Sequence, residues 1–351
     1  MTISFGNNQG AGSNIVFVHL NSKVPRYLIL NIKSVIRRFP SHKIYLITNS
    51  KKFQINLKGL ESFTYKHDNF WFEAEEFLSH PREFRSNFWL ISLARFFAIA
   101  QFMKQIPGPV LHIESDVVIS DDFPIAKFEG LTEYIAYPIV SQLRGIASTI
   151  YFSSPELAHK LALFCVNQAR ENGSTSDMLI LRRFYDRFPE DVYLLPIGPS
   201  SQFAYHDTAD IHFLNGIKKG LKYFNGIFDG SDIGVYYFGT DPRNRRGWST
   251  LRSPIDFNYS RMETWKCNFN ESRNFVEICH ESSLIPVFSI HATCKKPGLF
   301  KYGKSTQILK TRTYQSLLPS KNEFIFDIFL RQAYESVRRR ILIRDPKDFH
   351  A

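Results

Sequence analysis

Two carboxylates interrupt an otherwise apolar run, VLHIESDVVI, at residues 110–119. The run has the composition of a buried strand, yet it places Glu114 and Asp116 on either side of Ser115. Acidic groups past the carboxyl end of a strand lie where α/β proteins bind ligands. They can turn toward a hard divalent cation, which takes oxygen ligands and bridges protein carboxylates to phosphates. The stretch therefore favours a Mg²⁺ or Mn²⁺ site with Asp116 as the better ligand. The alternative is an ordinary strand-end turn with solvated acids.

A second polar strand end lies far along the chain, in LIPVFSIHATCKK at 284–296. The pattern predicts a strand that runs into His291, Lys295 and Lys296. An imidazole can complete a metal site, and a lysine beside a leaving phosphate stabilises the charge that develops as the bond breaks. A lone histidine at a strand end is more often a hydrogen-bonded turn residue. The lysines and the Pro297 that follow favour the ligand interpretation.

Strands and helices that alternate along the chain must position these polar ends. Residues 14–20 and 43–49 are short β-branched and aromatic runs, which predicts strands. Between them, 27–39 has apolar residues at helical spacing, with Pro25 before it and Pro40 after it. This β-α-β order predicts a parallel sheet whose carboxyl edge carries the ligand sites.

The later chain continues the same alternation. A strongly apolar segment at 88–105, which carries Arg95, predicts a helix. From about 200 to 260 the periodicity weakens and Gly, Asp, Asn, Tyr and Arg increase, which predicts long functional loops with short elements. Further strands are expected at 134–140 and 147–153, and further helices at 155–170 and 176–188.

The stretch 226–248 sets aspartates and arginines among glycines and aromatic residues. This composition suits sugar and phosphate recognition, and an ordinary polar surface loop is the alternative. Its Asp229 and Asp232 are candidate general bases.

Taken in order, these motifs resemble those of GT-A glycosyltransferases of the glycogenin and lipopolysaccharide galactosyltransferase type. There, an Arg-bearing helix precedes a DxD motif, for which this chain has ESD. A short strand follows, then a helix start with Asp, here Asp177, and a strand that ends in His before Lys-Pro. The resemblance covers roughly 14–300. The chain departs from the pattern at Glu114, at Ala147–Thr149, at Met178 and at Cys294.

The resemblance implies a Rossmann-like α/β fold of the GT-A class, with a mainly parallel central sheet flanked by helices. We expect one catalytic domain at 1–300, with a nucleotide-sugar half at 14–200 and an acceptor half at 201–300. The implied reaction is metal-dependent transfer of a hexosyl group from a UDP-sugar to a hydroxyl of a glycan or lipid-linked acceptor. Bacterial surface polysaccharide synthesis is the setting that this type suggests.

The same resemblance implies a role for each candidate residue. Asp177 would lie near the transferred sugar, and Asp229 or Asp232 would act as a base if the enzyme inverts the anomeric centre. The helix dipole offers a purely structural reason for Asp177, and an ion pair does so for Arg95. The expected metal ligands are Asp116, Glu114 and His291, and the expected donor-binding residues are Glu114, Ser115, Asp116, Arg95, Lys295, Lys296 and Asn21.

The net charge of +11 is concentrated at the C-terminal end, because residues 301–351 hold 11 Lys and Arg against 5 Asp and Glu. Within this basic extension, 322–344 has an apolar helical face flanked by arginines, after a capping Asn322. Such a helix can lie on an anionic membrane or pack on the catalytic domain. Nucleic-acid binding is a weaker alternative, because no recognition-helix or RNP-like signature appears.

The compartment is inferred from what the sequence lacks. It has no apolar signal segment, no run of 18 apolar residues and no CxxC pair among its four cysteines. We therefore expect a cytoplasmic protein, either free or peripheral on the inner face of the membrane. A non-catalytic binding protein of the same fold is the alternative to an enzyme, because several motif residues are replaced.

Overall fold

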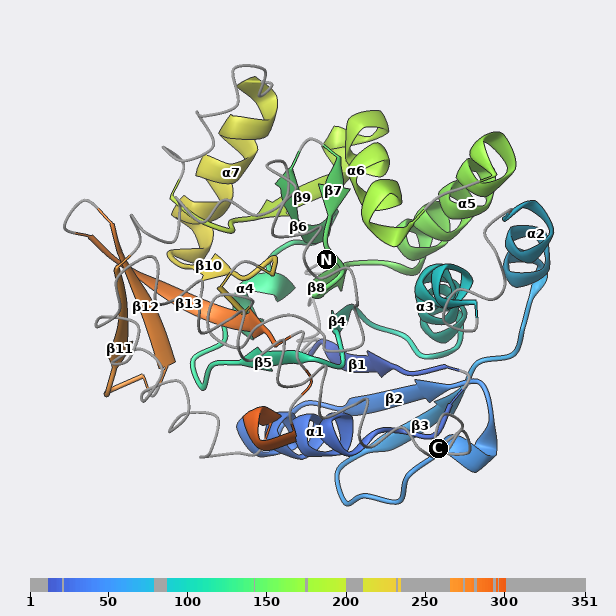
Figure 1. The fold of residues 1–351 in the computed structure, drawn as a ribbon, viewed down its shortest axis with the longest axis horizontal. Coiled ribbons are helices and arrows are strands. Elements are labelled where there is room, and N and C mark those ends of the chain that lie inside the picture. The colour runs from blue at the N-terminus through green and yellow to red at the C-terminus, as the bar shows by residue number, and fades with distance from the viewer. Residues whose placement is uncertain are drawn as a thin grey trace, which may run out of the picture.

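Parallel strands form one half of the central sheet of the computed structural model (Figure 1). β1 (Asn14–Val18) lies between β2 (Ile44–Thr48) and β4 (Val110–Ile113) and pairs with both in parallel. β3 (Glu61–Thr64) continues the parallel order on the far side of β2. β1, β2 and β4 are buried, whereas the edge strand β3 is partly exposed. Because these strands are parallel, as the β-α-β pattern predicts, their carboxyl ends meet at one edge.

The other half of the sheet changes direction. β8 (Thr149–Phe152) is antiparallel to both β4 and β6 (Ile135–Ser141). β6 pairs in addition with the short β7 (Arg144–Gly145) and, in parallel, with β9 (Val192–Leu195). Four of the seven pairings in this sheet, as far as the structure describes it, are parallel. The predicted mixed α/β fold with a mainly parallel sheet is confirmed.

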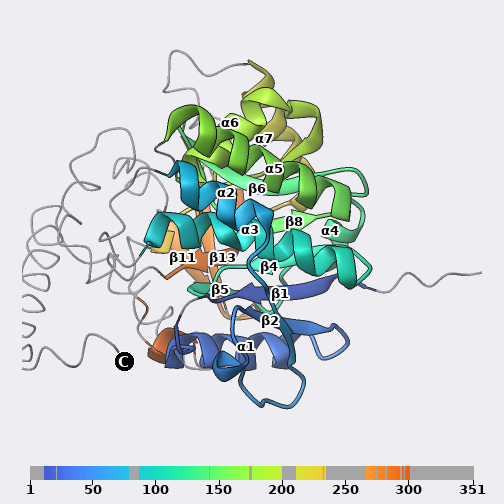
Figure 2. The same cartoon turned by 90° about the vertical axis from the view of Figure 1, so that its right-hand side faces the viewer.

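Helices cover both faces of the sheet (Figure 2). Along β1, Ile15 and Phe17 enter the core on one face, whereas Val16 enters the core on the other. This alternation places apolar side chains on both faces. Four helices pack on the Val16 face: α2 (Asn69–Phe77), α3 (Phe88–Gln105), α5 (Pro155–Asn172) and α6 (Asp177–Arg187). The opposite face is covered by α1 (Arg26–Arg38) and α4 (Ile125–Glu129).

A second sheet stands beside the first, on the left in Figure 1. Its central strand is β13 (Ser283–His291), which is parallel to β10 (Ile227–Phe228) and antiparallel to β12 (Phe275–His280). β11 (Lys266–Asn270) pairs with β12, and β5 (Val117–Ile119) pairs with the end of β13. Segments more than 150 residues apart therefore meet where β5 and β13 pair.

The prediction of one strand over 110–119 is wrong. The chain leaves the central sheet after Ile113 and enters the second sheet at Val117, so the stretch is two strands, β4 and β5. Glu114 to Val117 form a turn, in which the Val117 amide donates to the Glu114 carbonyl at 3.1 Å. The break occurs because β13 supplies a new pairing partner, which no local pattern indicates.

The prediction of long loops with short elements from 200 to 260 is wrong for 211–224. This stretch forms the 14-residue helix α7 (Ile211–Phe224), whereas the two-residue strand β10 that follows it is a short element of the predicted kind. Gly216 and Gly220 hide the helical pattern because glycine is a poor helix former. Gly220 is required by packing, since a Cβ there would clash with the Leu194 carbonyl oxygen. The absence of a side chain lets α7 approach β9 closely.

The remaining predicted elements can be compared only where the structure describes them. The helices expected at 27–39, 88–105, 155–170 and 176–188 are confirmed as α1, α3, α5 and α6, with ends shifted by no more than two residues. The described helices include none long and apolar enough to cross a membrane. The basic extension 301–351 lies outside the described residues, so its helix and its membrane contact stay predictions. Described are 12–20, 22–78, 87–141, 143–173, 176–199, 211–231, 233–234, 266–273, 275–280, 283–292, 295 and 297–300.

Candidate functional site

The turn between β4 and β5 brings two carboxylates to the boundary of the two sheets. The Glu114 amide donates to the Ser148 carbonyl at 2.9 Å, which keeps Glu114 beside the end of β8. Asp116 is 4% exposed and immediately precedes β5. Both side chains therefore lie at the carboxyl edge of β4, as the sequence predicts.

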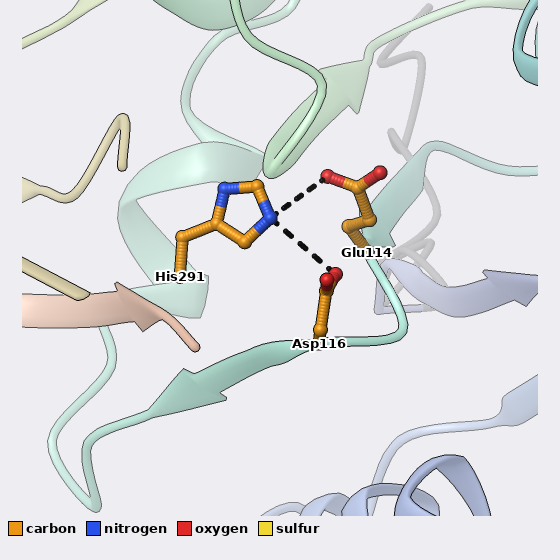
Figure 3. Close-up of side chains that lie close together, drawn as sticks. All are labelled: Glu114, Asp116 and His291. Atoms are coloured by element: carbon orange, nitrogen blue, oxygen red, sulfur yellow. Dashed lines mark ion pairs between the residues drawn. The ribbon is translucent and has the colours of Figure 1, made fainter. Parts of the chain in front are cut away.

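His291 approaches these carboxylates from the second sheet (Figure 3). It is the last residue of β13 and pairs in register with Val117, and the next amide, of Ala292, donates to the Asp116 carbonyl at 2.8 Å. Its Nε2 lies 3.4 Å from Asp116 Oδ1 and 3.5 Å from Glu114 Oε2. Its Nδ1 lies 3.2 Å from the Gly230 carbonyl oxygen. A proton on Nδ1 satisfies that carbonyl, so Nε2 is the nitrogen that faces the carboxylates and can bind a metal when it is deprotonated.

Two cations flank the cluster of Glu114, Asp116 and His291, which we call the acid–histidine cluster. Arg95, from α3, places Nη1 2.7 Å from Glu114 Oε1. Lys295 places Nζ 3.3 Å from Asp116 Oδ2. Each carboxylate thus gives one oxygen to a cation and turns the other toward His291. Lys295 has φ of 54°, which is uncommon for a residue with a side chain and marks a constrained loop at this point.

Asp177 joins the cluster through Arg95. Its Oδ2 lies 3.2 Å from Arg95 Nη2, so one guanidinium bridges Asp177 and Glu114. Asp177 begins α6 behind the cap of Ser176, whose hydroxyl accepts from the Leu179 amide at 3.3 Å. Burial raises the pKa of Asp177, and the Arg95 charge opposes this shift. The helix N-terminus and Arg95 together stabilise a carboxylate that is 7% exposed.

Asp229, which follows β10, supports the backbone of the site. Its Oδ2 accepts from the amides of Gly234 at 2.7 Å and His291 at 2.9 Å, and its Oδ1 accepts from Ile233 at 3.1 Å. Burial raises its pKa, against these three donors and the nearby imidazole. All of these contacts hold the end of β13 in place.

The charges of the cluster depend on one another. Burial would raise the pKa of Asp116, but Lys295 and His291 outweigh burial, so its pKa is lowered. Burial likewise opposes ionisation of Glu114, and Arg95 nevertheless lowers its pKa. In the same way, burial disfavours the imidazolium of His291, yet the Asp116 charge raises its pKa to about 9. Both carboxyls of the turn are therefore ionised at neutral pH.

The donor set fits a divalent cation. In the part of the chain that the structure describes, Glu114, Asp116 and His291 offer ligand atoms that all lie within 4.8 Å of one another. Carboxylate oxygens suit both Mg²⁺ and Mn²⁺, and an imidazole nitrogen is the softer ligand that transition metals accept. The hydrogen bond from His291 Nδ1 to Gly230 is the outer contact that fixes a metal-binding imidazole.

A further histidine, His112, is buried in β4. It belongs to the stretch VLHIESDVVI, but no role was predicted for it. It is 1% exposed, and its Nδ1 lies 3.0 Å from the Val16 carbonyl oxygen. Burial, reinforced by the charge of Arg95, lowers its pKa to about 4. His112 is therefore neutral in the folded protein at neutral pH.

Because folded His112 is neutral, the free energy of unfolding should decrease as the pH is lowered. An unfolded histidine takes up a proton near pH 6.5, whereas folded His112 does so only near pH 4. The free energy of unfolding should therefore fall by about 3 kcal/mol as pH drops from 6.5 to 4, and little further below. Urea unfolding of wild type and His112→Gln across this range measures the difference. The glutamine variant should lack this component, and parallel curves for the two proteins would show that His112 titrates normally.

The structure brings together most of the residues predicted for the site. Arg95, predicted to bind the donor, is paired with two carboxylates, and the Ser115 hydroxyl lies 3.4 Å from the Tyr27 hydroxyl. Asn21, Asp232 and Lys296 lie outside the described residues, so their roles stay predictions. Sequence reasoning missed Asn31 in α1, whose amide contacts the turn. Its signal was a polar residue, poor at forming helices, inside an apolar helix.

No protein-family model and no curated protein sequence matches this chain. Its fold is similar to several solved structures of glycosyltransferases. One is the galactosyltransferase LgtC in complex with donor and acceptor sugar analogues, at 13% identity and a TM-score of 0.41, over 57% of this chain and 81% of that one. Another is the apo form of GlyE from Streptococcus pneumoniae TIGR4, at 17% identity and a TM-score of 0.34, over 52% of this chain and 45% of that one. The PaToxG glycosyltransferase has 9% identity and a TM-score of 0.35, over 59% of this chain and 79% of that one.

Proposed function

We propose that this protein is a metal-dependent glycosyltransferase that moves a hexosyl group from a nucleoside diphosphate sugar to a hydroxyl of a glycan or lipid-linked acceptor. One observation carries the proposal. Glu114 and Asp116 meet His291 at the boundary of two sheets, with ligand atoms within 4.8 Å of one another. UDP is the donor nucleotide that we expect, and Mn²⁺ or Mg²⁺ the ion.

The charge balance of the site supports a bound cation. Four carboxyl groups lie in or against the acid–histidine cluster, those of Glu114, Asp116, Asp177 and Asp229, and each residue but Glu114 is less than 9% exposed. Among the described residues, Arg95 and Lys295 contact them, and His291 adds a third positive charge when it is protonated. Buried charges in proteins are paired or bind metals. A divalent ion held by Glu114, Asp116 and His291 would supply positive charge to these carboxylates in place of the second proton on His291.

The side chains of the cluster divide the work. Asp116, Glu114 and His291 would hold the ion, which when bound supplies positive charge to a diphosphate leaving group. Lys295, 3.3 Å from Asp116, supplies a second positive charge at the same place and binds the diphosphate. Arg95 holds Glu114 and Asp177 in position through its two ion pairs. Asp177, which pairs with the other terminal nitrogen of Arg95, faces the transferred sugar in this proposal.

The choice of a general base depends on the stereochemical course. An inverting enzyme needs a carboxylate near the acceptor hydroxyl, and Asp177, Asp229 and Asp232 are the candidates. Both oxygens of Asp229 already accept amide hydrogens, which favours a structural role for it. A retaining enzyme requires no dedicated base.

Calorimetric titration with nucleotides tests the proposal. UDP, GDP, CMP and dTDP would each be titrated into the full-length protein with Mn²⁺ and again with EDTA. We expect UDP to bind, and only with Mn²⁺. Equal affinity in EDTA, or no binding of any nucleotide, would count against the proposed site.

Turnover separates an enzyme from a binding protein. Sugar donors that carry the nucleotide found to bind would each be incubated with the protein and Mn²⁺. Release of the free nucleotide would be measured. Slow hydrolysis by water is expected even without the acceptor. Tight metal-dependent binding with no release for any sugar would support the non-catalytic alternative.

A further inference from the structure

An amide side chain lies buried beneath the turn that carries Glu114 and Asp116. Asn31, in the middle of α1, is 2% exposed. Its Nδ2 lies 3.1 Å from the Ser115 carbonyl oxygen and 2.8 Å from the Val117 carbonyl oxygen. A primary amide has two N–H groups, so each carbonyl can receive one of them. These two carbonyls flank Asp116 on either side.

Neither the helix nor the core explains an asparagine at this position. Asparagine is less favourable than leucine in a helix interior, because its side chain competes for backbone hydrogen bonds. Among the other buried residues of α1, Leu28, Ile32 and Val35 are apolar and only the small Ser34 is polar. An apolar residue here would suit both the helix and the core, but it would leave two buried carbonyls of the turn without these donors.

The same helix also contacts the chain that follows His291. Tyr27, one turn before Asn31, has its hydroxyl 3.4 Å from the Ser115 hydroxyl. The Tyr27 ring packs on Phe300, with centroids 5.5 Å apart. Phe300 ends the short helical turn Pro297–Phe300, which lies against α1. One face of α1 therefore supports both segments that meet in the acid–histidine cluster.

The geometry points to Asn31 as a positioning residue for the metal ligands, an inference that rests on the proposed function. By holding the carbonyls on both sides of Asp116, Asn31 fixes the turn conformation that sets the two carboxylates at their distances from His291. Without the two N–H donors of Asn31, the turn would no longer hold the two carboxylates at these distances from His291. Outer contacts of this kind change metal affinity 10- to 100-fold when removed.

Mn²⁺ binding to the full-length protein, without nucleotide or acceptor, tests this role. Asn31→Leu keeps the branched shape of the side chain and removes both donors, and Asn31→Ala is a smaller second variant that forms helix well. Val35→Ala is the matched control, because Val35 is fully buried one turn further along α1. The readouts are the electron paramagnetic resonance signal of free Mn²⁺ and the urea midpoint.

We expect both Asn31 variants to bind Mn²⁺ at least 10-fold more weakly than wild type. Val35→Ala should lower the urea midpoint yet bind Mn²⁺ within about twofold of wild type, since the valine side chain donates no hydrogen bond to the turn. Unchanged Mn²⁺ affinity in a folded Asn31 variant would overturn the positioning role alone. Equal loss of affinity in Val35→Ala would also overturn it, by showing a general effect of destabilising α1. A wild-type protein that binds no Mn²⁺ would overturn both this inference and the proposed metal site.

Discussion

Asp116→Asn is expected to abolish manganese-dependent nucleotide binding and to lower the rate of transfer about 10³-fold, the upper range for loss of one electrostatic group. Asp116 is the most buried carboxylate of the turn and is contacted by both His291 and Lys295. The amide keeps the shape of the side chain but loses the charge that a divalent ion requires. Steady-state kinetics and calorimetric titration with Mn²⁺ measure the two effects.

The fold should survive this substitution. His291 keeps Glu114 as a partner at 3.5 Å, and the Lys295 side chain is 26% exposed and can turn toward water. Asp122→Asn is the matched control: this carboxylate follows the other end of β5 and pairs with Arg273 at 2.6 Å. The control should retain full activity. Normal transfer by Asp116→Asn would rule out Asp116 as a metal ligand.

Arg95→Leu is expected to cause the largest loss of stability. The Arg95 side chain is 14% exposed and bridges Glu114 at 2.7 Å and Asp177 at 3.2 Å. Removing it leaves two largely buried carboxylates without their cation, which typically costs about 3–5 kcal/mol. Urea unfolding at pH 7 measures this difference. Arg170→Leu removes an exposed pair with Glu73 and should cost about 1 kcal/mol or less.

The pH dependence distinguishes an electrostatic loss from a packing loss. In wild type, burial disfavours ionised Glu114, but Arg95 keeps the pKa of this carboxyl below its usual value. The ionised carboxylate therefore contributes to the free energy of unfolding at pH values above the usual pKa, and this contribution is lost as the pH falls. In Arg95→Leu the same carboxyl is expected to have a raised pKa, so its burial becomes less costly as it protonates. The difference in free energy of unfolding between wild type and Arg95→Leu should therefore narrow toward pH 4, and a constant difference would indicate a loss of packing alone.

A double variant provides a second test. Asp177→Asn added to Arg95→Leu should recover part of the lost stability, because it removes one of the two unpaired carboxylates.

Local sequence was sufficient for the elements that surround the site. Helical spacing located α1 and α3, and an apolar run with a parallel neighbour is consistent with the burial of β1 on both of its faces. The polar strand ends at 114–116 and at His291 were likewise visible, because charged groups at the end of an apolar run contradict a simple buried strand. These features depend on neighbours within a few residues, so a single sequence contains them.

Only the tertiary structure decided how those polar ends are arranged. β4 and β5 separate because β13, more than 160 residues later, offers β5 a pairing edge. Asp229, predicted as a possible base, holds the His291 backbone, and Asn31 holds the turn from a helix. Such contacts join segments whose separation along the chain bears no relation to any period of helix or strand. The sequence alone determined the kinds of residues available at the site, and long-range pairing determined which of them meet.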